Sequence, residues 1–108
     1  MFIITNTTDI GEYTPSKTET FEEAQNFMYE TTVNNYVAGV RDFSEFAKDT
    51  NTERCESYEE LKQKNLLKTF LDWMSKDGTG SCYSEKSTTV VYADSTFNKM
   101  TIYNLDEI

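Results

Sequence analysis

This 108-residue sequence contains no histidine, one proline, four glycines and two cysteines. The lack of histidine removes the most frequent general base and the most frequent metal ligand. So few glycines, prolines and cysteines exclude a collagen-like chain, a Pro/Gly-rich chain and a disulfide scaffold. Only 10 Lys and Arg oppose 19 Asp and Glu, which excludes a basic nucleic-acid-binding protein.

Long apolar runs are also missing. The apolar start Met1–Ile4 turns polar at once, without the basic region, apolar core and cleavage site of a signal peptide. No stretch approaches the ~20 apolar residues that a membrane helix needs. We therefore expect a cytoplasmic protein without membrane contact, with Cys55 and Cys82 as reduced thiols. Two cysteines without histidine cannot complete a zinc site, so we expect no metal and no cofactor.

Aromatic residues are plentiful, with seven Phe, seven Tyr and one Trp to build a core. Residues 1–108 are enough for one domain. The β-branched segments lie at the two ends of the chain. Residues 2–5, with the Gly11–Thr14 stretch that Pro15 ends, predict a hairpin or a strand plus an extended arm, and residues 88–93 and 97–105 predict a second hairpin.

Helix signals fill the middle of the chain. Thr20 and Glu23 fit a capping box, but the apolar residues after Thr31 lie on a different face from those before it, which predicts a kink near Thr31 or a turn before Gly39. Residues 42–47 add a short helical turn, and residues 48–56 are polar and predict a loop. A second capping box at Ser57–Glu60 predicts one helix reaching Lys76, which Gly78 ends. This order favours an α+β fold, a small antiparallel sheet packed against two to three helices.

The negative charge is unevenly distributed. Residues 1–61 hold 13 acidic and four basic residues and carry the whole net charge of −9, whereas residues 62–108 hold six of each. A single-sign patch of this kind can bind a basic surface, although acids in a first helical turn and on a solvated surface need no partner. The candidate partner-binding residues are Glu19, Glu22, Glu23, Glu30, Asp42, Glu45, Asp49, Glu53, Glu56, Glu59 and Glu60.

On a continuous helix, Glu19, Glu23 and Glu30 would share one face. Their spacings would be about 6 and 10 Å at ~1.5 Å rise per residue. A DNA strand advances about 3.4 Å per phosphate, so these carboxylates could replace every second or third phosphate.

No catalytic constellation emerges, so we expect a protein that is not an enzyme. The adjacent acids Glu22–Glu23 and Glu59–Glu60 point in different directions on a helix, and neither cysteine has a histidine base. The Asp77–Ser81 loop superficially resembles a phosphate-binding loop. It follows a helix and lacks the P-loop lysine, which favours a helix stop instead.

The opening Phe2-Ile3-Ile4-Thr5-Asn6, the segment Glu19–Ala24 and the acidic excess resemble the small anti-defence proteins of bacteriophages. Anti-CRISPR proteins and DNA mimics are examples of this type. The resemblance implies stoichiometric inhibition in the host bacterial cytoplasm. An acidic face would occupy the basic groove of a nuclease or its guide complex, and the protein itself would bind no nucleic acid. A non-catalytic interaction or assembly module remains the alternative, including a homodimer joined through exposed Tyr or a hairpin edge.

Overall fold

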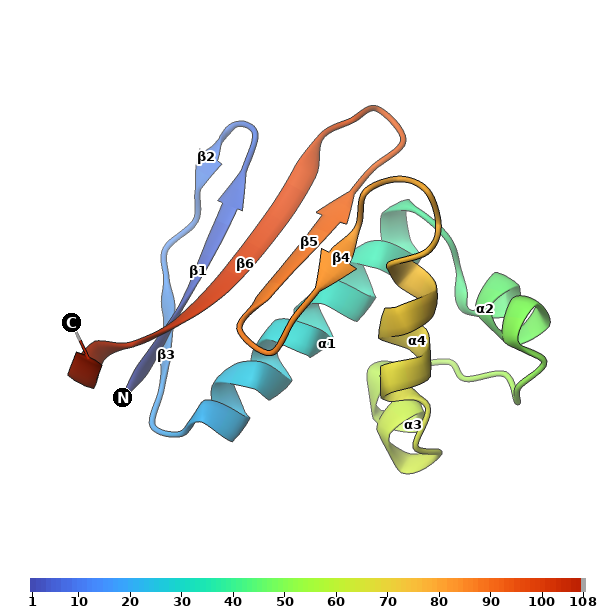
Figure 1. The fold of residues 1–108 in the computed structure, drawn as a ribbon, viewed down its shortest axis with the longest axis horizontal. Coiled ribbons are helices and arrows are strands. Elements are labelled where there is room, and N and C mark those ends of the chain that lie inside the picture. The colour runs from blue at the N-terminus through green and yellow to red at the C-terminus, as the bar shows by residue number, and fades with distance from the viewer. Residues whose placement is uncertain (108) are drawn as a thin grey trace.

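Residues 1–107, which the computed structural model describes, form an antiparallel sheet with the long helix α1 packed across one face (Figure 1). In chain order the elements are β1 (Phe2–Thr8), β2 (Gly11–Glu12), β3 (Ser16–Thr18), α1 (Phe21–Gly39), α2 (Phe43–Thr50), α3 (Tyr58–Gln63), α4 (Leu67–Met74), β4 (Cys82–Tyr83), β5 (Ser87–Val91), β6 (Phe97–Asn104) and a 3-10 turn at Leu105–Glu107. The α+β prediction is confirmed, with four α-helices in this part of the chain rather than two to three.

The two ends of the chain form the centre of the sheet. The strand order is β2-β1-β6-β5-β4, with β3 also paired to β1, and every pairing is antiparallel. β1 and β6 pair along seven residues, for example Ile4 with Ile102. This long-range pairing joins the N-terminal and C-terminal hairpins and brings the two termini to the same end of the sheet (Figure 1). β3, directly after Pro15, and the two-residue β4 were not predicted.

Helix α1 runs unbroken from Phe21 to Gly39, so both predicted alternatives, an interruption near Thr31 and a turn before Gly39, are wrong. Its two apolar faces are both buried because the helix lies between two core clusters. Ala24 and Met28 pack against Ile4 and Met100 of the sheet. Farther along, Val33 joins the aromatic cluster that α2 and α4 complete. A straight helix can therefore bury two different faces, provided that different elements cover them.

The predicted helix from Ser57 to Lys76 is wrong as a single element, because it is divided into α3 and α4. Asn65 adopts φ 59°, in the left-handed region. The Leu66 amide donates to the Leu61 carbonyl at 2.7 Å, and the Asn65 amide donates to the Lys62 carbonyl at 3.1 Å. These are the two hydrogen bonds of a Schellman motif, which ends α3 with asparagine in place of the usual glycine.

Helix α2 extends through Thr50, so the predicted loop over residues 48–56 begins only after the helix ends. Asp42 caps α2 by accepting a hydrogen bond from the Glu45 amide at 3.0 Å. Phe46 is fully buried, with its ring 5.0 Å from that of Phe70 in α4. The aromatic contact with α4 therefore holds a short, mostly polar helix in place.

One buried polar atom has no hydrogen-bond partner in the described residues: the Oδ1 of Asn6 in β1. Because an unpaired buried amide costs free energy, the Asn6→Val variant should be more stable by about 1 kcal/mol. Urea denaturation would measure this gain. In contrast, Asn104→Val should be neutral or destabilising, since the Oδ1 of Asn104 accepts from the Asp106 amide at 3.0 Å. Loss of stability in Asn6→Val would contradict the prediction.

Candidate protein-binding face

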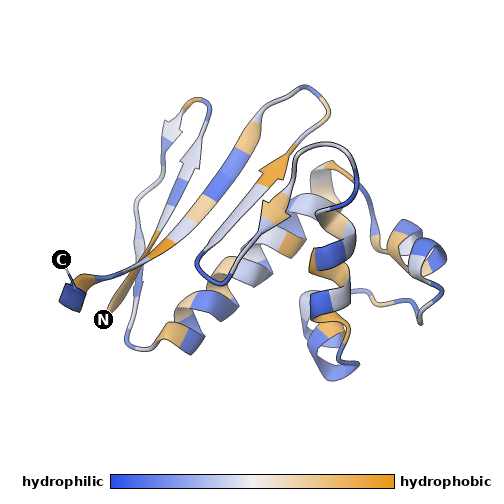
Figure 2. Ribbon diagram, viewed as in Figure 1, coloured by the Kyte–Doolittle hydropathy of each residue, from blue (hydrophilic) through white to orange (hydrophobic). Residues whose placement is uncertain are grey.

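The exposed face of α1 carries the first group of predicted acids. Glu22, Glu23, Phe27, Glu30 and Asn34 are all exposed. At about 100° per residue they cover an arc of about 140° around the helix, opposite the side that faces the sheet. We call these five residues the α1 face. Figure 2 shows hydrophilic residues on α2, α3 and α4 as well as on the N-terminal half of α1.

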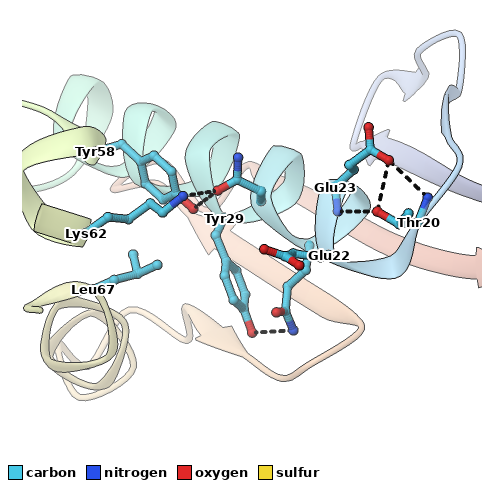
Figure 3. A pocket seen from close by; sticks show the side chains of 9 residues that line it. Thr20, Glu22, Glu23, Tyr29, Tyr58, Lys62 and Leu67 are labelled. Atoms are coloured by element: carbon cyan, nitrogen blue, oxygen red, sulfur yellow. Dashed lines mark hydrogen bonds between the residues drawn. The ribbon is translucent and has the colours of Figure 1, made fainter.

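The helical alignment of Glu19 with Glu23 and Glu30 is wrong, because α1 begins only at Phe21 and Glu19 precedes the N-cap residue Thr20. The predicted capping box is confirmed. The Glu23 carboxylate accepts from the Thr20 amide at 3.2 Å and from the Thr20 hydroxyl at 2.9 Å (Figure 3). Glu23 therefore has a structural role at the helix start. Glu22 and Glu30 make no ion pair within residues 1–107.

A groove of about 510 Å³ separates the N-terminal half of α1 from α3 and α4. Figure 3 shows Tyr58 and Lys62 of α3 pointing across it toward α1, with Leu67 of α4 beside them. Asn26 joins the two sides, because its Oδ1 accepts from the Tyr58 hydroxyl at 2.7 Å and from the Lys62 ammonium at 2.9 Å. Lys62 is thus the cation placed next to the α1 face, and it partly offsets the negative charge there.

Two of the candidate acids contribute to the raised pKa of Tyr58. Burial, with Glu30 and Glu59 as further causes, raises the pKa of Tyr58 to about 12. Glu30 of α1 and Glu59 of α3 therefore act on the same hydroxyl, although they are 29 positions apart in the sequence.

The seven candidate acids from Asp42 to Glu60, here called the second acidic group, are only partly neutralised, because three cations pair with five of them. Arg41 pairs with Glu45 and Asp49, Lys64 pairs with Glu53 and Glu60, and Arg54 pairs with Glu56. Asp42 is occupied as the N-cap of α2. Within residues 1–107, Glu59 is the acid of this group that neither forms an ion pair nor caps a helix.

Arg41 belongs to a structural cluster on α2 and α4. Its guanidinium lies 4.5 Å from the centre of the Trp73 ring, and the Trp73 Nε1 donates to Asp49 at 3.1 Å. The hydrogen bonds from Trp73 and Arg41 hold the pKa of the Asp49 carboxyl below its usual range. This carboxylate is therefore committed to contacts within the protein.

Phe27 is the feature of the α1 face that sequence reasoning missed. Its side chain is 42% exposed between Glu23 and Glu30. A shallow groove of about 400 Å³ beside it reaches Thr18 and Asn34. The sequence contained one usable signal: Phe27 lies three and four residues from acids, on the polar side of the helix.

The remaining candidate chemistry is structural. Cys55 is buried and Cys82 exposed, both as free thiols, and burial raises the pKa of Cys55, which opposes formation of a thiolate. The Asp77 carboxylate accepts from the Tyr36 hydroxyl at 2.5 Å and from the Thr79 amide at 2.8 Å. These bonds fix the loop after α4, where Gly78 has φ 84°.

Within residues 1–107, no group of three or more His, Cys, Asp or Glu side chains is placed to hold a metal ion. None of the described helices is both long enough and apolar enough to cross a membrane. No protein family model, curated protein or solved structure matches this chain.

Proposed function

We propose that this protein is a stoichiometric inhibitor of the anti-CRISPR type that binds a basic surface of a host defence nuclease through the α1 face. The observation that carries the proposal is an exposed aromatic side chain between carboxylates that have no cation of their own. Glu23 and Glu30 lie next to Phe27 on the same side of α1, whereas Glu22 lies about 140° from Phe27 around the helix, at the other edge of the α1 face. A non-catalytic role in the host cytoplasm is part of the proposal.

The aromatic side chain favours a protein as the partner. Protein interfaces are centred on aromatic anchors with a polar rim, and complementary charges raise the association rate. Phe27 would be the anchor, and the carboxylates would contact Lys or Arg on the target. The surface that a nuclease uses to hold nucleic acid has this positive charge. Occupying that surface would block nucleic acid without imitating its phosphate spacing.

The partner-binding set is narrower than the one predicted from the sequence. Glu22, Glu30 and Glu59 remain available, and Glu19 lies just before the helix. Glu23 contributes charge, but its carboxylate is held by Thr20. The paired acids of α2 and of the α2–α3 loop contribute less to binding. Their ion pairs with nearby cations reduce the attraction that they exert on a basic partner.

Charge reversal tests the proposal. The double variant Glu22→Lys/Glu30→Lys and the variant Phe27→Ser should each weaken capture of the target by at least tenfold. The immobilised protein would be exposed to a bacterial lysate at low and high salt, and the captured protein identified and purified. Titration with the purified target would then give the affinity, and addition of the target's nucleic acid should compete.

The matched control is Glu12→Lys/Glu107→Lys, which changes the net charge equally at exposed carboxylates that do not belong to the α1 face. This control should bind almost as tightly as the unmodified protein. Equal weakening by both double variants would mean that net charge alone matters, and the assignment of the α1 face would fail. Binding that is insensitive to salt would also contradict it.

An assembly module is the second candidate, favoured by the uncovered outer face of the sheet. α1 packs on the side of Ile4 and Met100, while Tyr103 of β6 points to the opposite side and is 47% exposed. If this face joins two copies, light scattering at high salt would give twice the monomer mass of 12.5 kDa. A monomer at all salt concentrations would remove this candidate.

A further inference from the structure

The outer face of the sheet is the side that α1 does not cover, and Figure 1 looks onto it with α1 behind the strands. Directly paired residues of neighbouring strands point to the same side of a sheet. The register of β1 with β6 therefore places Ile3 and Tyr103 side by side in one row of this face. Thr7 and Lys99 form a second row, four residues farther along β1.

The strands β2 and β3, on the other side of β1, add one charged side chain to each row. Lys17 pairs with Ile3, and Glu12 pairs with Thr7. The Thr7 hydroxyl donates to the Glu12 carboxylate at 3.5 Å, so these two side chains point to the same side. Glu12, Lys17 and Lys99 are exposed, and none of them forms an ion pair within residues 1–107. The two rows thus present two ammonium groups and one carboxylate without an oppositely charged neighbour in the same molecule.

The ends of the two rows form a rectangle centred on Thr5 of β1. Each corner lies about 7 Å along the strands from the Thr5 row and about 5 Å across from β1. In order around the rectangle, the corners are Lys17, Glu12, Lys99 and Tyr103. The two ammonium groups therefore occupy one diagonal, and the carboxylate and the tyrosine ring occupy the other.

A second copy related by a twofold axis across the strands, through the Thr5 row, matches this pattern. The rotation exchanges the two rows, so Lys17 of each copy faces Glu12 of the other. Lys99 of each copy likewise faces the Tyr103 ring of the other. These contacts amount to two ion pairs and two cation–π contacts. Thr5 on the axis meets its own counterpart, which a hydroxyl tolerates because it can both donate and accept.

We propose that a second copy of this chain covers the outer face, with the twofold axis across the strands at Thr5. Stacked sheets pack about 10 Å apart with their strands aligned within about 30°, and long side chains such as Lys and Glu can span that distance. This proposal develops the assembly candidate above and rests on the same face. It does not depend on the inhibitor proposal, because the α1 face lies on the other side of the sheet and stays exposed in such a dimer.

The size of the outer face predicts a weak, reversible dimer. Five neighbouring strands, spaced about 4.8 Å apart, and seven residues at about 3.4 Å each give on the order of 500 Å² per copy. Stable complexes bury about 800 Å² per partner. Each copy also carries a net charge of −9, although two Lys and one Glu leave the two rows at +1. We therefore expect a dissociation constant on the order of 100 µM.

Sedimentation equilibrium measures this constant between about 10 µM and 1 mM protein at about 0.15 M salt. Glu12→Lys and Lys17→Glu should each weaken self-association at least tenfold, because two ion pairs become two repulsive pairs. Glu12→Lys changes the net charge from −9 to −7, so a general charge effect would strengthen association instead. The control Glu107→Lys has the same net charge and lies at the groove with Phe2 and Ile102 on the inner face. It should associate at least as tightly as the unmodified protein.

An equimolar mixture of Glu12→Lys and Lys17→Glu tests the proposed axis. One copy then carries two carboxylates at these positions and the other carries two ammonium groups, so both ion pairs form again. The mixture should therefore return to within about threefold of the unmodified affinity, which would also show that both variants are folded. Recovery in a mixture of Glu12→Lys with Lys99→Glu instead would place the twofold axis along β1 and overturn the proposed arrangement.

Three further results would overturn the proposal: a monomer at about 1 mM protein, a mixture that associates no better than its components, and weakening by Glu107→Lys equal to that by Glu12→Lys. Glu22→Lys/Glu30→Lys separates this proposal from the inhibitor proposal. It should lose the target and keep its self-association, whereas Glu12→Lys should keep the target, since capture uses the other side of the molecule. Loss of self-association in Glu22→Lys/Glu30→Lys would place the contact between copies on the α1 face and overturn the dimer proposed here.

Discussion

Replacement of Phe70 by alanine should lower the free energy of unfolding by about 3–5 kcal/mol. The Phe70 side chain is fully buried, and its ring lies 5.0 to 5.9 Å from those of Phe46, Trp73, Tyr36 and Phe43. Removing this ring leaves a cavity where α1, α2 and α4 meet. Urea denaturation followed by the fluorescence of Trp73, the single tryptophan of the chain, reports directly on this cluster.

Phe27→Ala provides the matched control, since it is the same chemical change at a partly exposed position. It should cost less than about 1 kcal/mol. A loss below 1 kcal/mol in Phe70→Ala would mean that the aromatic cluster is not what holds α2 and α4 together. A large loss in Phe27→Ala would instead show that Phe27 belongs to the core, which would remove it from the α1 face.

Alkaline pH should destabilise the protein through its buried tyrosines. Burial and the nearby acids raise the pKa of Tyr58 to about 12, against an ordinary value near 10. Between pH 10 and 12 the unfolded chain loses the Tyr58 proton while the folded protein keeps it. The stability from this group is therefore complete below pH 10 and lost as pH rises toward 12, a decrease on the order of 2 kcal/mol. The hydrogen bond to Asp72 raises the pKa of Tyr83 to about 12, which acts in the same direction.

Urea denaturation at several pH values would measure this decrease. Tyr58→Phe should be less stable than the unmodified protein at pH 7, because Asn26 loses a hydrogen bond. Its stability should nevertheless fall less steeply between pH 10 and 12, since one titrating group is gone. Parallel pH profiles for the two proteins would contradict the role assigned to Tyr58.

The candidate site could be predicted only in part. The acids of α1 were found from their type and from the lack of nearby basic residues, because both are local properties. The ion pairs that partly neutralise the second acidic group were not predicted. Lys64 follows α3 and pairs with Glu53, which precedes that helix. Arg41 precedes α2 and pairs with Asp49 in it. These ion pairs depend on where each helix ends and on the direction of the chain after it. A count of charges along the sequence contains neither.

The sequence by itself determined the local structure of this protein. Thr20 with Glu23 fixed the start of α1, Ser57 fixed the start of α3 through the Glu60 amide, and the β-branched segments became β1, β5 and β6. Hydrogen-bonding groups and turn residues act over a few positions, so their effect can be predicted from neighbours. The aromatic residues from which a core was expected include Phe46 and Phe70, and both are fully buried.

Only the tertiary structure decided how these elements cover one another. The two apolar faces of α1 looked incompatible with a straight helix until different parts of the chain buried each face. Asn65 could interrupt a helix because Leu66 and Leu67 gain contacts with the core by turning away from α3. Phe27 stays exposed because no element of residues 1–107 covers that side of α1. Burial is a property of the assembled fold, and it decides which acids and aromatic rings remain available to a partner.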